Sequence, residues 1–343
     1  MSDGPATVEP RPIRLSSEVS VPVRRPFLLL LASLMLLLAA CGGGGDSSAK
    51  KKSDVDMGDK ITGLTVSGKF GAQPTLKVAK PVKATKPETQ VITAGDGKPV
   101  VANKKAMFDI YLAKGSDGSK LYSDLDRGTP TQVSMQENQF FKVVIDSLVG
   151  KPQGSRVAIA ATVKDVWGAA GVPQLKLKTT DTVLFVIDVL SVEPTNVLSG
   201  PKGTKVSAPA TAPKVEQSGS KVTGIDFSKA PKKAPKKLEV IPLVKGTGPV
   251  AKAGQLVTFN YYGAVYGAKK AFDSSFSRGA PVPFGVGVHG LIPAWDKVIP
   301  GLKQGSRVLI IAPPKYAYGS RKQQNIPANS TLTFVVDVLG VDS

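Results

Sequence analysis

Reactive side chains are scarce in this sequence. The 343 residues include one cysteine, Cys41, and one histidine, His289. A single cysteine excludes an intrachain disulfide and any structural zinc site built on several cysteines. A single histidine excludes metal sites that need a histidine pair. Because no serine or cysteine is placed in the sequence as a triad partner for His289, hydrolase chemistry is disfavoured, and we expect no metal and no cofactor.

Negative charge is also in short supply. The chain has 45 Lys and Arg against 26 Asp and Glu, which gives a formal net charge of +19. Such an excess can indicate nucleic-acid binding, but no recognition motif for nucleic acid is present, and we expect no such partner. The hydrophobic share of 41% is sufficient for packed cores.

The longest hydrophobic run occupies residues 27–40, directly after Arg24 and Arg25. Its 14 residues are too few for a transmembrane helix, which needs about 20, but they suit the core of a signal peptide. The run ends in Leu-Ala-Ala before Cys41 and four glycines, which resembles a bacterial lipobox. We therefore predict a signal peptide over 1–40 and a lipid anchor on Cys41, on the extracytoplasmic face of the cell membrane.

Two alternatives stay open in this segment. The run could be a short buried helix that happens to end at Cys41. The sequence Arg24-Arg25-Pro26-Phe27-Leu28 resembles a twin-arginine export signal, but an ordinary basic segment before a secretory signal has the same pattern.

A repeat indicates two related domains. The repeat distance of about 150 residues is far longer than the 20–50 residues of a solenoid repeat. We predict domains over 61–195 and 238–343. The paired stretches are Lys60–Gly63 with Lys221–Gly224, Gln153–Val157 with Gln304–Val308, and Thr182–Leu190 with Thr331–Leu339.

The segment between the two domains, 196–237, is rich in lysine and proline. Residues 199–237 alone hold nine lysines, five prolines and two acids. Such a composition predicts an extended, solvated linker, and residues 41–60 are expected to form a flexible tether.

The pattern within each copy predicts an α+β fold with a mainly antiparallel sheet and one short helix. In the second copy, β-rich runs lie between Gly and Pro turns. They are Leu256–Tyr262, Arg307–Ala312 and Thr331–Leu339, and the helix candidate is Leu291–Val298.

Aromatic residues are concentrated in the second copy, which holds eleven of the 21 in the chain. They predict an apolar cavity with a few polar groups. Five motifs in this region, in this order, resemble the FKBP-type peptidyl-prolyl cis–trans isomerases over about 238–343. They are Asn260–Gly263, Phe272–Ser275, Leu291–Trp295, Gly305–Arg307 and Tyr316–Gly319.

The resemblance implies a curved antiparallel sheet wrapped around a short helix, with a pocket between them. Trp295 would form the floor under the proline ring, and Ile326 would belong to a loop that overhangs the site. The walls would be Tyr261, Phe272, Val282, Leu291, Ile292 and Phe334.

The resemblance also implies the polar groups of the site. The backbone N–H of Ile292 and the hydroxyl of Tyr318 would hold substrate carbonyls. Asp273 would lie beside the rotating amide, in a network with Tyr261 and Arg278. Gly290 departs from the family, because many relatives have an acid there, and the loop after Gly319 is one residue shorter and lacks the usual histidine.

The function implied is isomerisation of X–Pro bonds in exported polypeptides by a monomer, without covalent chemistry. The resemblance adds macrolide immunosuppressants as ligands. An X–Pro bond rotates over a barrier of about 18–20 kcal/mol, and a pocket that favours the twisted amide lowers it. The alternative is a lipoprotein that binds polypeptides without catalysis, as a chaperone or an adhesin.

The first copy is expected to be a divergent FKBP-like domain with weak or no activity. Spacing aligns Ser123 with Asp273 and places a two-residue insertion between Leu148 and Gly154. The other predicted pairs are Tyr111 with Tyr261, Tyr122 with Phe272, Phe141 with Trp295, Trp167 with Tyr318, and Phe185 with Phe334.

Overall fold

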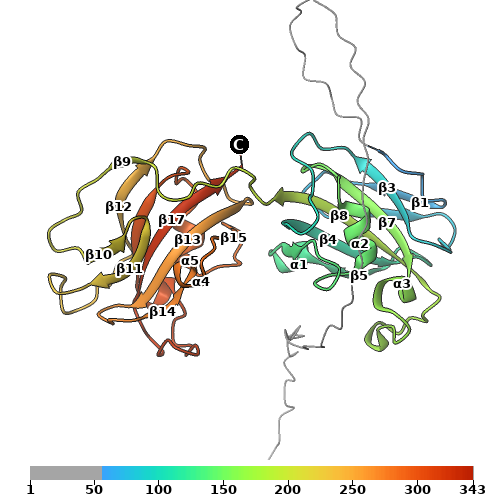
Figure 1. Cartoon of the computed structure of the whole chain (residues 1–343). Coiled ribbons are helices and arrows are strands. Elements are labelled where there is room, and N and C mark those ends of the chain that lie inside the picture. Colours follow the sequence, from blue (N-terminus) through green and yellow to red (C-terminus); the bar gives the residue numbers. More distant parts are fainter. Residues whose placement is uncertain (1–55, 343) are drawn as a thin grey trace, which may run out of the picture. The chain divides into compact units, whose positions relative to one another are not determined.

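The computed structural model describes residues 56–342, which form two mainly antiparallel sheets with short helices (Figure 1). The predicted signal peptide 1–40, Cys41 and most of the 41–60 tether lie outside the described residues. Within 56–342, no helix is long and apolar enough to cross a membrane. The architecture is the α+β arrangement that the sequence predicts.

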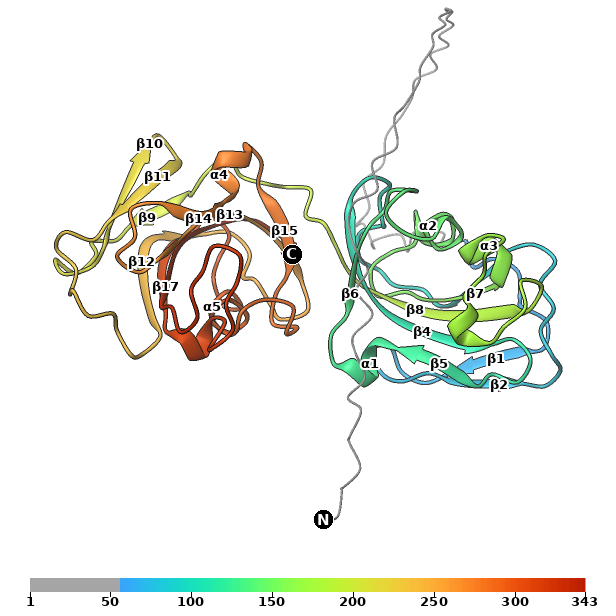
Figure 2. The ribbon, with the colours of Figure 1, turned by 90° about the horizontal axis from the view of Figure 1, so that it is seen from below.

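The second sheet holds seven strands in the order β14-β13-β17-β16-β12-β9, and β15 also pairs with β13. Its central strand β17 is buried along its whole length, because α5 (Pro293–Val298) covers one face and a hairpin covers the other. Figure 2 shows α5 within the curve of this sheet. The strands are β9 (Gly203–Lys205), β12 (Glu239–Gly246), β13 (Leu256–Val265), β14 (Ala271–Ser274), β15 (Val282–Gly285), β16 (Arg307–Ala312) and β17 (Leu332–Val341).

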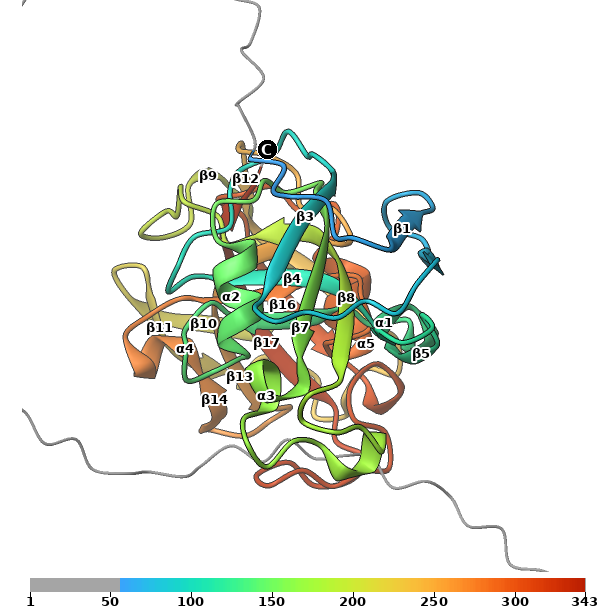
Figure 3. The ribbon, with the colours of Figure 1, turned by 90° about the vertical axis from the view of Figure 1, so that its right-hand side faces the viewer.

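The first sheet repeats this arrangement with the order β3-β7-β8-β4-β5, and β6 pairs with β4. Helix α2 (Lys142–Leu148) lies across its face, as α5 does in the second domain (Figure 3). The strands are β3 (Glu88–Thr93), β4 (Lys105–Lys114), β5 (Lys120–Ser123), β6 (Thr131–Ser134), β7 (Arg156–Thr162) and β8 (Thr182–Val192).

Each domain has more than the one short helix predicted. The additional helices are single turns at strand ends, too short to give a periodic apolar pattern. They are α1 (Asp124–Arg127), α3 (Val163–Trp167) and η1 (Pro173–Leu175) in the first domain, and α4 (Ser275–Arg278) and η2 (Pro314–Tyr316) in the second.

A β-hairpin packs on the outer face of each sheet, held by a buried Arg–Asp ion pair. In the first domain, Arg156 binds Asp188 at 2.6 and 2.7 Å and donates to the carbonyls of Gly68 and Ala72. Those carbonyls belong to the loop between β1 (Leu64–Ser67) and β2 (Thr75–Val78).

The second domain repeats this clamp on its own hairpin, β10 (Lys214–Ser218) and β11 (Lys221–Asp226). Arg307 binds Asp337 at 2.5 and 2.7 Å and reaches the hairpin through Gln217 and the Ser220 carbonyl.

The prediction of an extended, solvated linker over 196–237 is therefore wrong. Strand β9 pairs with β12, and the hairpin buries Val222 and Ile225 against Leu309 and Val335 of the second sheet. Few apolar residues are needed for this contact, and the many lysines remain at the surface. The amino-acid composition alone therefore does not predict the strand and the hairpin.

Candidate functional site

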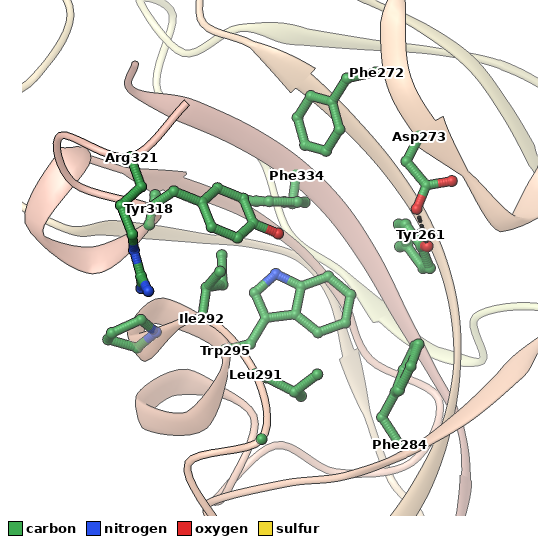
Figure 4. A pocket seen from close by; sticks show the side chains of 13 residues that line it. Tyr261, Phe272, Asp273, Phe284, Leu291, Ile292, Trp295, Tyr318, Arg321 and Phe334 are labelled. Carbon is green, nitrogen blue, oxygen red and sulfur yellow. Dashed lines mark hydrogen bonds between the residues drawn. The ribbon is translucent and has the colours of Figure 1, made fainter. Parts of the chain in front are cut away.

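A pocket of about 420 Å³ opens between α5 and the sheet of the second domain (Figure 4). Eight of the predicted site residues line it: Tyr261, Phe272, Asp273, Leu291, Ile292, Trp295, Tyr318 and Phe334. Residues more than 70 positions apart in the sequence thus meet in one cavity.

The indole of Trp295 forms the centre of the aromatic wall. Its ring meets Tyr261 edge-to-face at a centroid distance of 5.4 Å and Phe334 at 5.5 Å, and Phe334 meets Phe272 at 5.7 Å. Such edge-to-face contacts fix each ring in place. The indole Nε1 is buried and has no hydrogen-bond partner among the described residues.

The polar side of the pocket is a network of three groups. The hydroxyl of Tyr261 and the guanidinium of Arg278 both donate to the carboxylate of Asp273. Arg278 also donates to the Tyr261 oxygen at 2.7 Å. The two donors hold the carboxylate of Asp273 at the edge of the aromatic wall.

This network fixes the protonation states of its members. Partial burial raises the pKa of Asp273, but the hydrogen bonds from Tyr261 and Arg278 and the guanidinium charge outweigh it, and the pKa lies below its usual value. Burial and the bond to Asp273 raise the pKa of Tyr261 to about 12. At neutral pH the site therefore holds a carboxylate and a neutral phenol.

Two further donors belong to residues that line the pocket: the hydroxyl of Tyr318 and the backbone N–H of Ile292. Burial, with a smaller effect of Asp273, raises the pKa of Tyr318, so its hydroxyl stays protonated. Figure 4 shows this hydroxyl directed toward the aromatic wall. Ile292 is the N-cap of α5, and Pro293 follows it at the first helical position, where the lack of an N–H is tolerated.

Three predicted residues do not line the pocket. Arg278 acts from behind Asp273, Ile326 is buried in the domain core, and Val282 lies on β15 opposite Phe259. Phe284, two residues further along β15, lines the pocket instead. The period of two in a strand places both side chains on one face, so the sequence alone leaves the choice between them open.

Five lining residues were not predicted: Gly290, Pro293, Ala317, Arg321 and Phe284. Arg321 lies in the polar loop after Gly319 and brings a positive charge to the pocket. His289 is exposed and is not among the lining residues.

Comparisons with known proteins identify the family of the second domain. The family model for FKBP-type peptidyl-prolyl cis-trans isomerase matches residues 248–339. The chain is 38% identical over 109 residues to an FK506-binding protein of Streptomyces anulatus, an alignment that covers 31% of this chain and 88% of the relative. The chain belongs to the FKBP-type peptidyl-prolyl isomerases.

A solved structure and a second relative are also similar to this chain. The crystal structure of the three FKBP domains of wheat FKBP73 is 15% identical, with a TM-score of 0.32, and the match covers 74% of this chain and 94% of that one. Peptidyl-prolyl cis-trans isomerase Fkbp12 of Drosophila melanogaster is 42% identical over 107 residues, which cover 31% of this chain and 98% of the relative. The family match and the two relatives confirm the predicted enzyme class.

Strand register aligns the two FKBP-like domains and corrects the predicted pairing. Tyr111 faces Ser123 and Val186 as Tyr262 faces Ser274 and Val335. The first domain therefore has Ile110 in place of Tyr261, Leu121 in place of Phe272, and Tyr122 in place of Asp273. Spacing alone misplaced these residues by one, because tyrosines at 111, 261 and 262 offer two equally good alignments.

The helices give a second correction. The backbone N–H of Val144 donates to the carbonyl of Phe141, as that of Trp295 donates to the carbonyl of Ile292. Val144 therefore occupies the position of Trp295, and Phe141 occupies the position of Ile292. The turn after α2 also matches the turn after α5, because the backbone N–H of Lys151 donates to the carbonyl of Leu148 as that of Leu302 donates to the carbonyl of Ile299. No insertion exists before Gly154. The two extra residues lie in the loop 169–181, which corresponds to 320–330.

The equivalence of Trp167 with Tyr318 and of Phe185 with Phe334 agrees with the structure. In the first domain Trp167 packs on Phe141 at 5.5 Å and on Phe185 at 6.5 Å. These three rings come from positions that line the pocket in the second domain. In the first domain they contact one another, and a large aromatic ring, that of Phe141, stands where the second domain has Ile292.

Proposed function

We propose that the second domain catalyses isomerisation of X–Pro bonds in exported polypeptides without covalent chemistry. The observation that carries this proposal is the set of aromatic rings around Trp295 with an ionised Asp273 at its edge. Neither a nucleophile nor a proton transfer is needed, because the reaction is rotation about one bond.

The pocket lowers the barrier by preferring the twisted amide. A planar amide is strongly dipolar through resonance, and that resonance is lost in the twisted state. An aromatic cavity that excludes water therefore disfavours the planar form more than the twisted one. In this mechanism the proline ring sits on Trp295, and the N–H of Ile292 and the hydroxyl of Tyr318 hold substrate carbonyls. Because these contacts hold the substrate on one side of the X–Pro bond, the group on the other side of that bond can rotate.

Asp273 acts on the carbonyl that rotates. Its negative charge, placed by Tyr261 and Arg278, shapes the field at the point where the amide loses its resonance dipole. Proline-containing polypeptides are the substrates. The relatives named as FK506-binding proteins support a macrolide as a second ligand of the same pocket.

The test is a protease-coupled proline-peptide assay on the full chain. Asp273→Ala and Trp295→Leu each lower kcat/KM at least about tenfold, which corresponds to about 1.4 kcal/mol of lost transition-state stabilisation. Tyr122→Ala, at the corresponding place in the first domain, is the matched control and leaves the rate unchanged. If the unmodified chain binds the peptide without accelerating isomerisation, the alternative of a non-catalytic chaperone or adhesin replaces this proposal.

We further propose that Cys41 carries the lipid that anchors the chain outside the cytoplasm. The apolar run 27–40 and the glycines after Cys41 support this location. Mass spectrometry of the mature N-terminus tests it. An acylated Cys41 supports the anchor, and a chain that retains Met1 refutes it.

A further inference from the structure

A second groove is lined by the C-terminal end of α5, whose N-terminal part lines the isomerase pocket. Its volume is about 540 Å³. Four half-buried apolar side chains line it, Leu238, Val298, Leu302 and Tyr316, together with three exposed lysines: Lys237, Lys297 and Lys315. We call this surface the lysine groove.

The lysines converge without a counter-charge. The ammonium nitrogens of Lys297 and Lys315 lie 5.7 and 4.9 Å from the centroid of the same ring, that of Tyr316. Within residues 56–342, no ion pair joins any of the three lysines to a carboxylate. Like charges gathered at one ring repel each other, and an anion in the groove would relieve that repulsion.

The acidic side chains next to these residues in the sequence are directed elsewhere. Asp296 precedes Lys297 on α5 but accepts from the backbone N–H of Gly287 at 2.7 Å. Glu239 follows Leu238 at the start of β12, where the period of two turns it to the opposite face, toward Ile241 and Tyr266. The groove is therefore positive and apolar at once.

The same two elements build the groove and the isomerase pocket. Pro293 and Trp295 of α5 line the pocket, and Lys297 and Val298 of α5 line the groove. On the η2 side, Tyr318 faces the pocket and Tyr316 the groove. Helix α5 has six residues, so it spans about 9 Å, a distance that about three residues of extended chain cover.

We propose that the lysine groove is a subsite for client polypeptides that carry an acidic stretch with a large apolar side chain about three to five residues from the proline. The inference rests on the proposed isomerase function, because it takes the client proline to occupy the pocket. The apolar residue packs on Leu238, Val298 and Tyr316, and the acids pair with the lysines. A polypeptide is favoured over an anionic lipid because the groove adjoins the site where the polypeptide is held.

The experiment compares two labelled peptides with the same Ala-Leu-Pro-Phe core. One carries Glu-Glu-Phe-Glu joined directly to the core, the other Gln-Gln-Phe-Gln, and each is made with the extension at either end, so that the added Phe lies four residues from the proline. Fluorescence anisotropy with the full chain at about 0.1 M salt, where charges interact over about 10 Å, gives the two dissociation constants. The acidic peptide is expected to bind about tenfold more tightly in one of the two orientations.

Two double variants with the same change in charge test whether the lysine groove is the site that binds the acidic extension. Lys297→Glu with Lys315→Glu abolishes or inverts the acidic preference. Lys269→Glu with Lys270→Glu, at exposed lysines of the same domain that do not line the groove, preserves it. Equal affinity of the two peptides, or an equal loss in both variants, overturns the proposal.

Two further measurements distinguish a polypeptide subsite from a lipid site and from the isomerase pocket. If vesicles of phosphatidylglycerol bind the full chain in a manner that depends on Lys297 and Lys315, while the peptides bind alike, the groove is a lipid site and the proposal is wrong. Acceleration of a short proline peptide that lacks any extension reports on the isomerase function alone. Its absence would remove that function, whereas the ratio of the two dissociation constants tests the groove.

Discussion

The two domains share a strand arrangement and differ in the side chains at the position of the pocket. Apart from the additional edge strand β9 in the second domain, both have the same strand order, the same buried Arg–Asp pair and a hairpin clamped on the outer face. In the second domain, Tyr261, Asp273 and Trp295 surround an open pocket. In the first, Ile110, Tyr122 and Val144 take those places, and the rings of Phe141 and Trp167 pack on each other at 5.5 Å. We therefore propose that the shared fold depends on buried charge and apolar strands, and that activity depends on a few residues that line the pocket of the second domain.

Substitutions that break the buried ion pairs should cause the largest loss of unfolding free energy, and the loss should be nearly equal in the two domains. Arg156→Met and Arg307→Met each leave a buried aspartate without its partner, which costs about 3–5 kcal/mol of unfolding free energy. Burial already raises the pKa of Asp337, and Arg307 opposes that rise. Urea unfolding measures the loss, with Arg321→Met, at an exposed arginine, as the control. A wild-type unfolding curve for either buried variant would show that the clamp does not hold that domain.

A smaller effect, the dependence of stability on pH, should distinguish the cores of the two domains. Burial and the charges of Asp124 and Asp188 raise the pKa of Asp109 to about 6, although Arg156 opposes them. The second domain has Asn260 at this position, which accepts a hydrogen bond from Ser275 at 2.9 Å. A carboxyl whose pKa is higher in the folded than in the unfolded chain stabilises the fold below about pH 4 and loses that contribution as pH rises through 6.

Asp109→Asn should therefore stabilise the first domain above pH 6 and have little effect at pH 4. We expect a gain of about 1–2 kcal/mol, below the full linkage value because the carboxyl is only half-buried. Urea midpoints measured from pH 4 to 8 check this. Asn260→Asp is the reciprocal variant and should introduce a pH dependence of the same sign but smaller size into the second domain, because Ser275 stands there in place of Asp124. Parallel pH curves for Asp109→Asn and the unmodified chain would refute the assignment.

The smallest expected effect is that of pH on catalysis. With the pKa of Asp273 below its usual value and that of Tyr261 near 12, neither group titrates near neutrality. The value of kcat/KM should change less than about twofold between pH 6 and 9, since no proton transfer limits the step. Arg278→Gln removes a cause that lowers the pKa of Asp273, so the fall in activity at acid pH should begin at a higher pH. A bell-shaped profile centred near pH 7 in the unmodified chain would contradict the mechanism.

The sequence predicts the frame and most of the pocket because both rest on residues with strong local patterns. Strand β16 has the predicted bounds, Arg307–Ala312, and α5 lies within the predicted helix. Phe284 was missed because strand alternation alone cannot tell it from Val282. The fold of 196–237 was missed because two buried residues, Val222 and Ile225, anchor a stretch dominated by lysine. Alignment of the two copies failed where neighbouring tyrosines are interchangeable in sequence, and only the register of β4 with β5 and β8 separates them.

The central claim is that isomerase activity depends on the rim of the second pocket. Transfer of the residues of the first domain to the second, as Tyr261→Ile with Asp273→Tyr in the full chain, tests it most directly, with far-ultraviolet circular dichroism to verify the fold. The protease-coupled assay should then show a loss of more than about nine-tenths of kcat/KM, more than about 1.4 kcal/mol of transition-state stabilisation, although the first domain is untouched. Retention of half or more of the activity in a folded variant would place the catalysis elsewhere in the chain and contradict the account.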